Sequence, residues 1–221
     1  MEYYPVCLDV KNRNCLVVGG GSVGARKVLT LLKCGAKVTI VSLSFSEKIK
    51  NLKHENIKYK KKQYHKNDLK GIFLVIGATN DIELNKKVWH DTQKKNMLCN
   101  IVDFPKTCNF ILPAIVKRGD LIIAVSTSGK SPAFAKKLRQ DLEKEFGQEY
   151  ADFLFLMGKI RNRLLAKEHA PEEHKTIFQE FIKAGLLEMI AKKNYIKINK
   201  LLFQILGKGY SYENLISGKE L

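Results

Sequence analysis

Residues 15–27, which read CLVVGGGSVGARK, constrain the fold of this chain more than any other segment. An apolar run ends at a glycine cluster, and an amphipathic segment follows at once. Gly19, Gly21 and Gly24 match the G-x-G-x-x-G spacing of dinucleotide-binding turns between a strand and a helix. In such turns the glycines permit a tight turn, close approach of a pyrophosphate and close helix–strand packing, while the first helical N–H groups face the phosphates. The alternative is a glycine-rich turn that holds no ligand.

Apolar, β-branched segments alternate with amphipathic ones beyond this turn. We predict strands at 15–18, 37–42, 57–64, 73–79 and 97–102, and helices at 23–34, 45–52 and 81–95. Gly35 is expected just past the end of the first helix, and Asn80 is expected to cap the third. The alternation is typical of an α/β protein with a Rossmann-like, doubly wound parallel sheet, here over residues 1–112.

The pattern changes after residue 110. Two apolar runs, 110–116 and 121–125, flank a short turn at Gly119 and predict a β-hairpin. Ser131 followed by Pro132 predicts the start of a helix over 133–146. Segments 149–167, 171–193 and 196–206 are all predicted to be helical. We therefore expect a central hairpin/helix segment over 113–148 and a small all-helical domain over 149–221.

Ligands of open parallel sheets bind beyond the carboxyl ends of the strands. Ala78 and Thr79 follow one predicted strand, and small side chains there allow a cofactor to lie close to the backbone. Asp103 follows the next strand, where a carboxylate can take a proton while a cofactor takes a hydride. The alternative for Asp103 is a turn aspartate that precedes Phe104.

The second predicted strand departs from the usual NAD fingerprint. An Asp or Glu about twenty residues beyond the glycines normally binds the ribose hydroxyls. Here the strand ends with Ser42, Leu43 and Ser44, and no arginine stands there for a 2′-phosphate either. The sequence alone therefore leaves open the preference between NAD and NADP.

Composition narrows the class of protein. The 39 Lys and Arg residues against 22 Asp and Glu residues give a net charge of +17, which attracts nucleic acid or a small polycarboxylate. The five cysteines show no CxxC spacing and the five histidines are dispersed, so we expect no metal site. No long apolar run or signal-peptide pattern is present, so we expect a cytoplasmic protein that does not bind membranes.

Linked motifs in this order resemble those of the precorrin-2 dehydrogenase family, the NAD-dependent module of siroheme synthase. Besides the glycine turn, they are ARK at 25–27, ATND at 78–81 with Asn85, NIVD at 100–103, FILP at 110–113 and STSGKSP at 126–132. The resemblance implies a Rossmann domain, a central dimerisation segment and a small helical domain. These parts match the boundaries expected above.

The resemblance also implies an activity, the oxidation of precorrin-2 to sirohydrochlorin with NAD⁺ as hydride acceptor and Asp103 as general acid/base. Some relatives also insert Fe²⁺ into sirohydrochlorin. Family members look like homodimers that bind the macrocycle between the cofactor and the partner subunit. Further cofactor contacts are expected at Ser22, Val23, Leu43 and Ser44, and substrate contacts at Asn100, Ser126, Thr127, Ser128 and Lys130.

The polycarboxylate character of precorrin-2 offers a reason for the positive charge. Arg118, Lys130 and Arg139 are candidates to bind its carboxylates, with a solvated surface as the alternative for each. The polar loop before the helix at Ser131 and Pro132 is expected to place a substrate carboxylate at the helix N-terminus.

Two other classes of function compete with the dehydrogenase. A nucleotide-sensing Rossmann module shares the glycine motif and needs no catalytic acid, but it usually retains the ribose acid that this chain lacks. A nucleic-acid binder would use the +17 charge, but the sequence contains no recognised nucleic-acid motif. We therefore expect an enzyme, with no nucleic acid among its partners.

Overall fold

The structure is a computed structural model, and it describes residues 3–102, 104, 108–166 and 171–217. Asp103 lies outside the described residues. The chain divides into two compact units, residues 1–112 and residues 113–221, and each is described by itself below.

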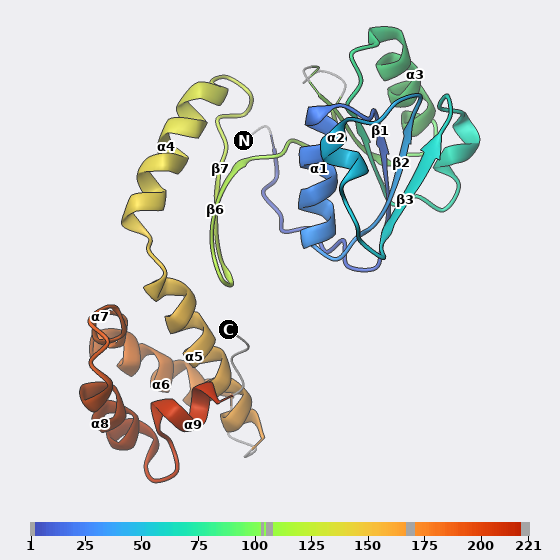
Figure 1. The fold of residues 1–221 in the computed structure, drawn as a ribbon. Helices are drawn as coiled ribbons and strands as arrows, with labels where there is room; N and C mark the ends of the chain where they lie inside the picture. Colours follow the sequence, from blue (N-terminus) through green and yellow to red (C-terminus); the bar gives the residue numbers. More distant parts are fainter. Residues whose placement is uncertain (1–2, 103, 105–107, 167–170, 218–221) are drawn as a thin grey trace. The chain divides into compact units, whose positions relative to one another are not determined.

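The first unit is built on a five-stranded parallel sheet, as predicted (Figure 1). Its strands are β1 (Asn14–Val18), β2 (Lys37–Ser42), β3 (Ile57–Lys61), β4 (Leu74–Gly77) and β5 (Leu98–Ile101), in the spatial order β3-β2-β1-β4-β5. The connecting helices are α1 (Ser22–Lys33), α2 (Glu47–Lys50), the 3-10 helix η1 (Lys66–Leu69) and α3 (Ile82–Gln93). This order confirms the Rossmann-like, doubly wound fold.

Side chains of β1 alternate between two apolar cores. Cys15 and Val17 belong to the core that contains residues of α1, whereas Leu16 and Val18 belong to the core that contains residues of α3. All four side chains are buried, because helices cover both faces of the sheet. This explains why β1 is a continuous apolar run in the sequence.

Helix α1 ends as its sequence predicts. Gly35 has φ +76°, and its N–H donates to the Leu32 carbonyl, while the Ala36 N–H donates to the Leu31 carbonyl. These two bonds form a Schellman motif, in which glycine accommodates the left-handed turn.

Two predictions for the first unit were wrong. Asp81, not Asn80, caps α3, because its Oδ1 accepts a hydrogen bond from the Leu84 N–H at 3.0 Å. Strand β3 ends at Lys61 instead of residue 64, because the chain turns into η1. The His65 side chain accepts from the Asn67 N–H there, and Tyr64 is buried.

The second unit begins with an antiparallel hairpin, β6 (Ala114–Arg118) and β7 (Leu121–Val125), followed by α4 (Pro132–Glu145). The hairpin was predicted, but its first strand starts at Ala114 instead of residue 110. Pro113 has no N–H to donate to a ladder. Ser131 caps α4 as predicted, because its Oγ accepts from the Phe134 N–H at 3.2 Å.

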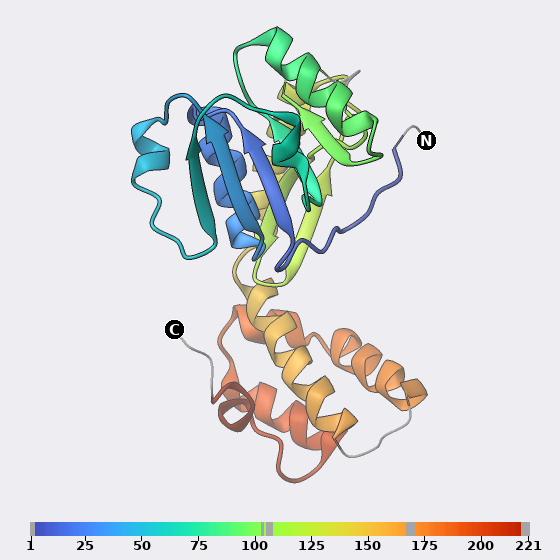
Figure 2. The same ribbon diagram turned by 90° about the vertical axis from the view of Figure 1, so that its right-hand side faces the viewer.

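The rest of the second unit is helical, as predicted (Figure 2). Its helices are α5 (Glu149–Leu165), α6 (Pro171–Lys183), α7 (Leu186–Ala191), α8 (Tyr195–Leu206) and α9 (Tyr212–Ile216). The single helix predicted over 171–193 was wrong, because the chain breaks at Gly185, which has φ +75°. Phe181 and Leu202 are fully buried in the core of these helices. Among the described residues, no helix is both long and apolar enough to cross a membrane.

Candidate functional site

A cleft of about 730 Å³ lies beyond the carboxyl ends of β1, β2 and β4. This is the edge at which open parallel sheets bind ligands, and the volume is within the range of small-molecule sites. Its walls come from four loops, with the lining residues Val18–Gly21, Val41–Ser46, Lys62–Tyr64, Ala78–Asp81, Glu83, Leu84 and Lys87.

The glycine turn has almost no space for side chains on its protein side. A Cβ on Gly19 would lie 2.2 Å from the Ala78 carbonyl oxygen, and one on Gly20 would lie 1.9 Å from the Ser44 carbonyl oxygen. A Cβ on Gly21 would meet nothing within 4 Å. Gly19 and Gly20 therefore let the β1 loop pack against its neighbours, while Gly21 leaves an open approach to the backbone.

The loop after β4 is held in place by Asn85 of α3, which is buried. Asn85 Nδ2 donates to the Thr79 carbonyl oxygen at 2.9 Å, and Thr79 Oγ1 lies 3.1 Å from Asn85 Oδ1. The same hydroxyl lies 2.9 Å from the Asp81 carbonyl oxygen. The floor of the cleft at Ala78 and Thr79 is thus fixed by side chains of the fold itself.

The structure places the predicted cofactor residues in two groups. Those that line the cleft are Gly19, Gly21, Leu43, Ser44, Ala78 and Thr79. Ser22, Val23 and Gly24 do not line it. A Cβ on Gly24 would lie 2.4 Å from the Gly19 carbonyl oxygen, so this glycine permits close packing of helix on strand.

The cleft has the features that a dinucleotide needs. Open backbone at Gly21 stands at the first turn of α1, where N–H groups without helical partners favour a phosphate. Ser46 lines the same cleft, and its Oγ is buried with no hydrogen-bond partner in the described part of the chain. The Ser46 hydroxyl is thus a polar group at the cleft that the described protein residues leave unsatisfied.

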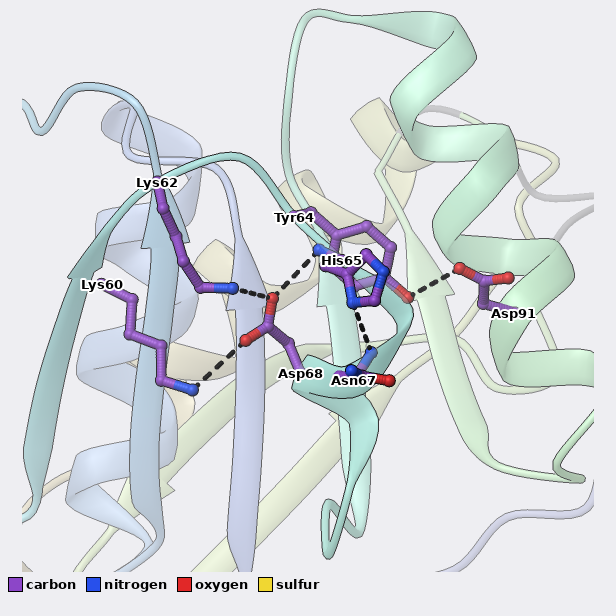
Figure 3. Close-up of polar contacts among 7 residues, drawn as sticks. All are labelled: Lys60, Lys62, Tyr64, His65, Asn67, Asp68 and Asp91. Atoms are coloured by element: carbon purple, nitrogen blue, oxygen red, sulfur yellow. Dashed lines mark hydrogen bonds and ion pairs between the residues drawn. The ribbon is translucent and has the colours of Figure 1, made fainter.

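The sequence reasoning missed the wall that follows β3, namely Lys62, Gln63 and Tyr64. Beside it, Asp68 of η1 is almost buried and accepts from Lys62 Nζ at 2.6 Å and from Lys60 Nζ at 3.2 Å (Figure 3). The His65 N–H also donates to Asp68, at 3.0 Å. Sequence spacing gave no signal for this cluster, because a 3-10 turn brings the carboxylate back to the strand.

The protonation of this cluster follows from its contacts. Burial of the Asp68 carboxyl group opposes its charged form, but the hydrogen bonds from Lys62 and the His65 N–H outweigh burial, so the pKa of Asp68 is lowered. Tyr64 behaves in the opposite way. Burial, and then the Asp91 carboxylate that its hydroxyl approaches at 3.1 Å, raise the pKa of Tyr64. Tyr64 is therefore a neutral part of the wall.

Asn100, a predicted substrate contact, is buried and is the next-to-last residue of β5. Its Nδ2 donates to the Phe110 carbonyl oxygen at 3.0 Å, so its amide ties the strand to the segment that follows. The predicted catalytic Asp103 lies outside the described residues. The functional roles of both residues stay predictions.

The serine-rich loop before α4 belongs to the second unit. Ser126 Oγ accepts from the Ser128 N–H and Thr127 Oγ1 accepts from the Ser131 N–H, each at 3.1 Å. Ser128 has φ +52°, and Lys130 is exposed. The loop is thus closed on itself by its own hydroxyls and presents a cation at its surface.

The two candidate arginines already have protein partners. Arg118 donates to the Glu143 carbonyl oxygen at 2.8 Å and so joins the hairpin to α4. Arg139 pairs with the Glu143 carboxylate. Lys130 is therefore the better candidate for an anion among the three. No group of three His, Cys, Asp or Glu side chains suited to a metal occurs within the described ranges.

Comparison with known proteins gives two family matches along the chain. A family described as putative NAD(P)-binding matches residues 6–114, and one described as sirohaem biosynthesis protein central matches residues 118–145. A solved structure titled SirC, precorrin-2 dehydrogenase, is 28% identical with a TM-score of 0.77, and the match covers 92% of this chain and 98% of that one.

Curated relatives are longer than this chain. The siroheme synthase of Vesicomyosocius okutanii is 35% identical over 191 residues, which are 86% of this chain and 41% of the relative. Siroheme synthase 1 of Serratia proteamaculans is 33% identical over 205 residues, which are 92% of this chain and 43% of the relative. The chain spans about two fifths of the length of these relatives.

Proposed function

We infer that the chain is a member of the precorrin-2 dehydrogenase family, and we propose that it oxidises precorrin-2 to sirohydrochlorin with NAD⁺ as hydride acceptor. The observation that carries this proposal is the glycine-lined cleft at the carboxyl ends of β1, β2 and β4. The similarity to a precorrin-2 dehydrogenase over nearly its whole length supports the same reaction.

In this proposal the backbone at Gly21 and the first turn of α1 bind the pyrophosphate, and Ser22 and Val23 contribute at that turn. Ser44 and Leu43 bind the ribose, and the fixed loop at Ala78 and Thr79 provides a wall of the cleft against which the cofactor packs. When bound, NAD⁺ supplies the acceptor for the hydride that leaves precorrin-2. Asp103 takes the accompanying proton, as a carboxylate general base.

The substrate carboxylates are assigned to the second unit. Ser126, Thr127 and Ser128 form the closed loop before α4, and Lys130 offers an exposed ammonium group beside the helix N-terminus. Positive charge and a helix start both favour a carboxylate. Asn100 is proposed as a further substrate contact. Fe²⁺ is proposed as a second substrate, inserted into sirohydrochlorin after the oxidation.

Anaerobic turnover tests the function. With precorrin-2 generated in situ and NAD⁺ added, we expect NADH and sirohydrochlorin to appear in equal amounts. The two products are measured by their absorbance at two wavelengths. Adding Fe²⁺ should then consume sirohydrochlorin faster than a reaction without protein. A known precorrin-2 dehydrogenase serves as the control for active substrate. NAD⁺ binding without any NADH would contradict the proposal and favour a nucleotide-sensing module.

We also propose a three-part division, with a cofactor domain over 1–112, a dimerisation segment over 113–148 and a helical domain over 149–221. The proposed compartment is the cytoplasm, which keeps the five free cysteines reduced. Recovery of the protein outside the cytoplasmic fraction of its host cell would contradict that placement.

The dimerisation proposal rests on one face of the hairpin. Ile115 and Ile122 are 43% and 52% exposed, and Ala124, which pairs with Ile115, is exposed on the same face, together with Lys117, which pairs with Ile122. The two isoleucines and Ala124 leave apolar surface exposed on this face, and a second copy that covers the face would bury that surface.

We expect Ile122→Lys to convert a dimer to a monomer, as measured by analytical ultracentrifugation. Burying a lysine in an apolar contact removes favourable burial and adds a desolvated charge. Ile196→Lys is the matched control, because Ile196 is an 84% exposed isoleucine on α8, away from the hairpin strands. A wild-type protein that sediments as a monomer at micromolar concentration would rule out the dimer.

A further inference from the structure

Among the residues that the structure describes, no acid lines the β2 side of the cleft. The residues that line it there are Val41–Ser46, and the neighbouring wall after β3 contributes Lys62, Gln63 and Tyr64. The lining acids, Asp81 and Glu83, belong to the cap and first turn of α3. A carboxylate at the end of β2 normally binds the ribose 2′-hydroxyl and repels a 2′-phosphate. This cleft lacks that repulsion and holds a lysine instead.

The backbone of Lys62 is fixed beside the end of β2. Its N–H donates to the Ser42 carbonyl oxygen at 3.1 Å, directly after the paired residues Ser42 and Lys61. Ser42 and Ser44 line the same cleft. The lysine side chain therefore starts beside the end of β2, which is the end of the strand that holds the ribose 2′-hydroxyl in dinucleotide sites.

Lys62 is not the only group that pairs with Asp68. Its side chain is 43% exposed, and its ammonium group shares Asp68 with that of Lys60, so the three groups carry one surplus positive charge (Figure 3). If Lys62 moves away, Lys60 Nζ and the His65 N–H still satisfy the Asp68 carboxylate. The exchange removes one hydrogen bond from a nearly buried carboxylate, but a phosphate dianion is a stronger partner for an ammonium group.

We propose that Lys62 determines cofactor specificity, by exchanging Asp68 for the 2′-phosphate of a bound dinucleotide, so that the chain accepts NADP⁺ as well as NAD⁺. Ser42 and Ser44 donate hydroxyl hydrogen bonds to the same phosphate. This inference rests on the proposed function, because it requires a dinucleotide whose adenosine ribose lies at the end of β2.

Calorimetric titration of the full chain with NAD⁺ and with NADP⁺ tests this assignment without relying on turnover. We expect the wild-type Kd for NADP⁺ to lie within about tenfold of the Kd for NAD⁺. In Lys62→Ala the Kd for NADP⁺ divided by the Kd for NAD⁺ should rise by about tenfold or more, because one charged hydrogen bond to the phosphate is lost. Lys60→Ala is the matched control, because Lys60 pairs with the same carboxylate but does not line the cleft. Its ratio should stay at the wild-type value.

The binding results distinguish failure of the Lys62 role from failure of the proposed function. Binding of NAD⁺ with no measurable binding of NADP⁺ overturns the role of Lys62 and leaves the proposed function intact. The role of Lys62 is also overturned if Lys62→Ala and Lys60→Ala change the ratio of the two Kd values equally. It is overturned as well if NAD⁺ does not displace bound NADP⁺. Failure of both dinucleotides to bind overturns the cofactor site itself, and the proposed function with it.

Discussion

Replacing Asp103 with asparagine is expected to lower the turnover of precorrin-2 by about 10²- to 10⁴-fold, the usual contribution of a general acid or base. Asparagine keeps the shape of the side chain but cannot take the proton that leaves with the hydride. The Kd for NAD⁺ should stay within about twofold, because removal of a proton-transfer group affects the chemical step and not cofactor binding. The measurements are initial rates under anaerobic conditions and calorimetric titration with NAD⁺.

Asp120→Asn is the control for Asp103→Asn. Asp120 is an exposed aspartate in the turn between β6 and β7, so its loss changes the same charge at a site without assigned chemistry. Its turnover should match the wild type. If Asp103→Asn loses NAD⁺ binding, Asp103 holds the loop after β5 and has a structural role. If Asp103→Asn retains full turnover, the general base is another group.

Alanine at Gly19 is expected to lower the free energy of unfolding by about 3 kcal/mol or more. Two costs combine at this position. A residue with φ +119° is strained for any side chain. The new Cβ would also lie 2.2 Å from the Ala78 carbonyl oxygen, which is backbone and cannot rotate away. Urea unfolding, followed by circular dichroism, measures this loss.

Gly21→Ala separates cofactor binding from folding. Gly21 has φ −81° and open space around its Cβ position, so alanine should change the free energy of unfolding by no more than about 1 kcal/mol, the scale of a helix-cap change. The methyl group would occupy the approach to the backbone, and the Kd for NAD⁺ should rise by about tenfold or more. Equal stability loss in Gly19→Ala and Gly21→Ala would show that the two glycines do not have separate roles.

The first unit could be predicted in most respects because its signals are local. The order of apolar strand, glycine turn and amphipathic helix predicted β1 and α1, and the Gly35 terminus followed from the need for a left-handed turn. The alternation of elements predicted a parallel sheet. Local signals also produced the errors. Asn80 and Asp81 are both good caps, and only the path of the loop selected Asp81.

The cofactor site was only partly predictable. The glycine turn and the residues after β2 and β4 were expected in the cleft, because they directly follow strands. Lys62, Gln63 and Lys87 were not, because lysines and other polar residues are as common on a solvated surface as in a cleft, and this chain is rich in lysine. Their place in the cleft follows from the neighbouring strand and from the face that α3 presents.

The sequence by itself determined the fold class, the glycine turn and the start of α4 at Ser131, because each depends on contacts between residues close together in the chain. Only the tertiary structure decided that Lys62 stands beside Ser42 and that Asp68 returns to hold it. Those contacts join different strands and a turn, and their distances depend on strand order and register. A one-dimensional pattern does not specify which charged residues such an arrangement brings together.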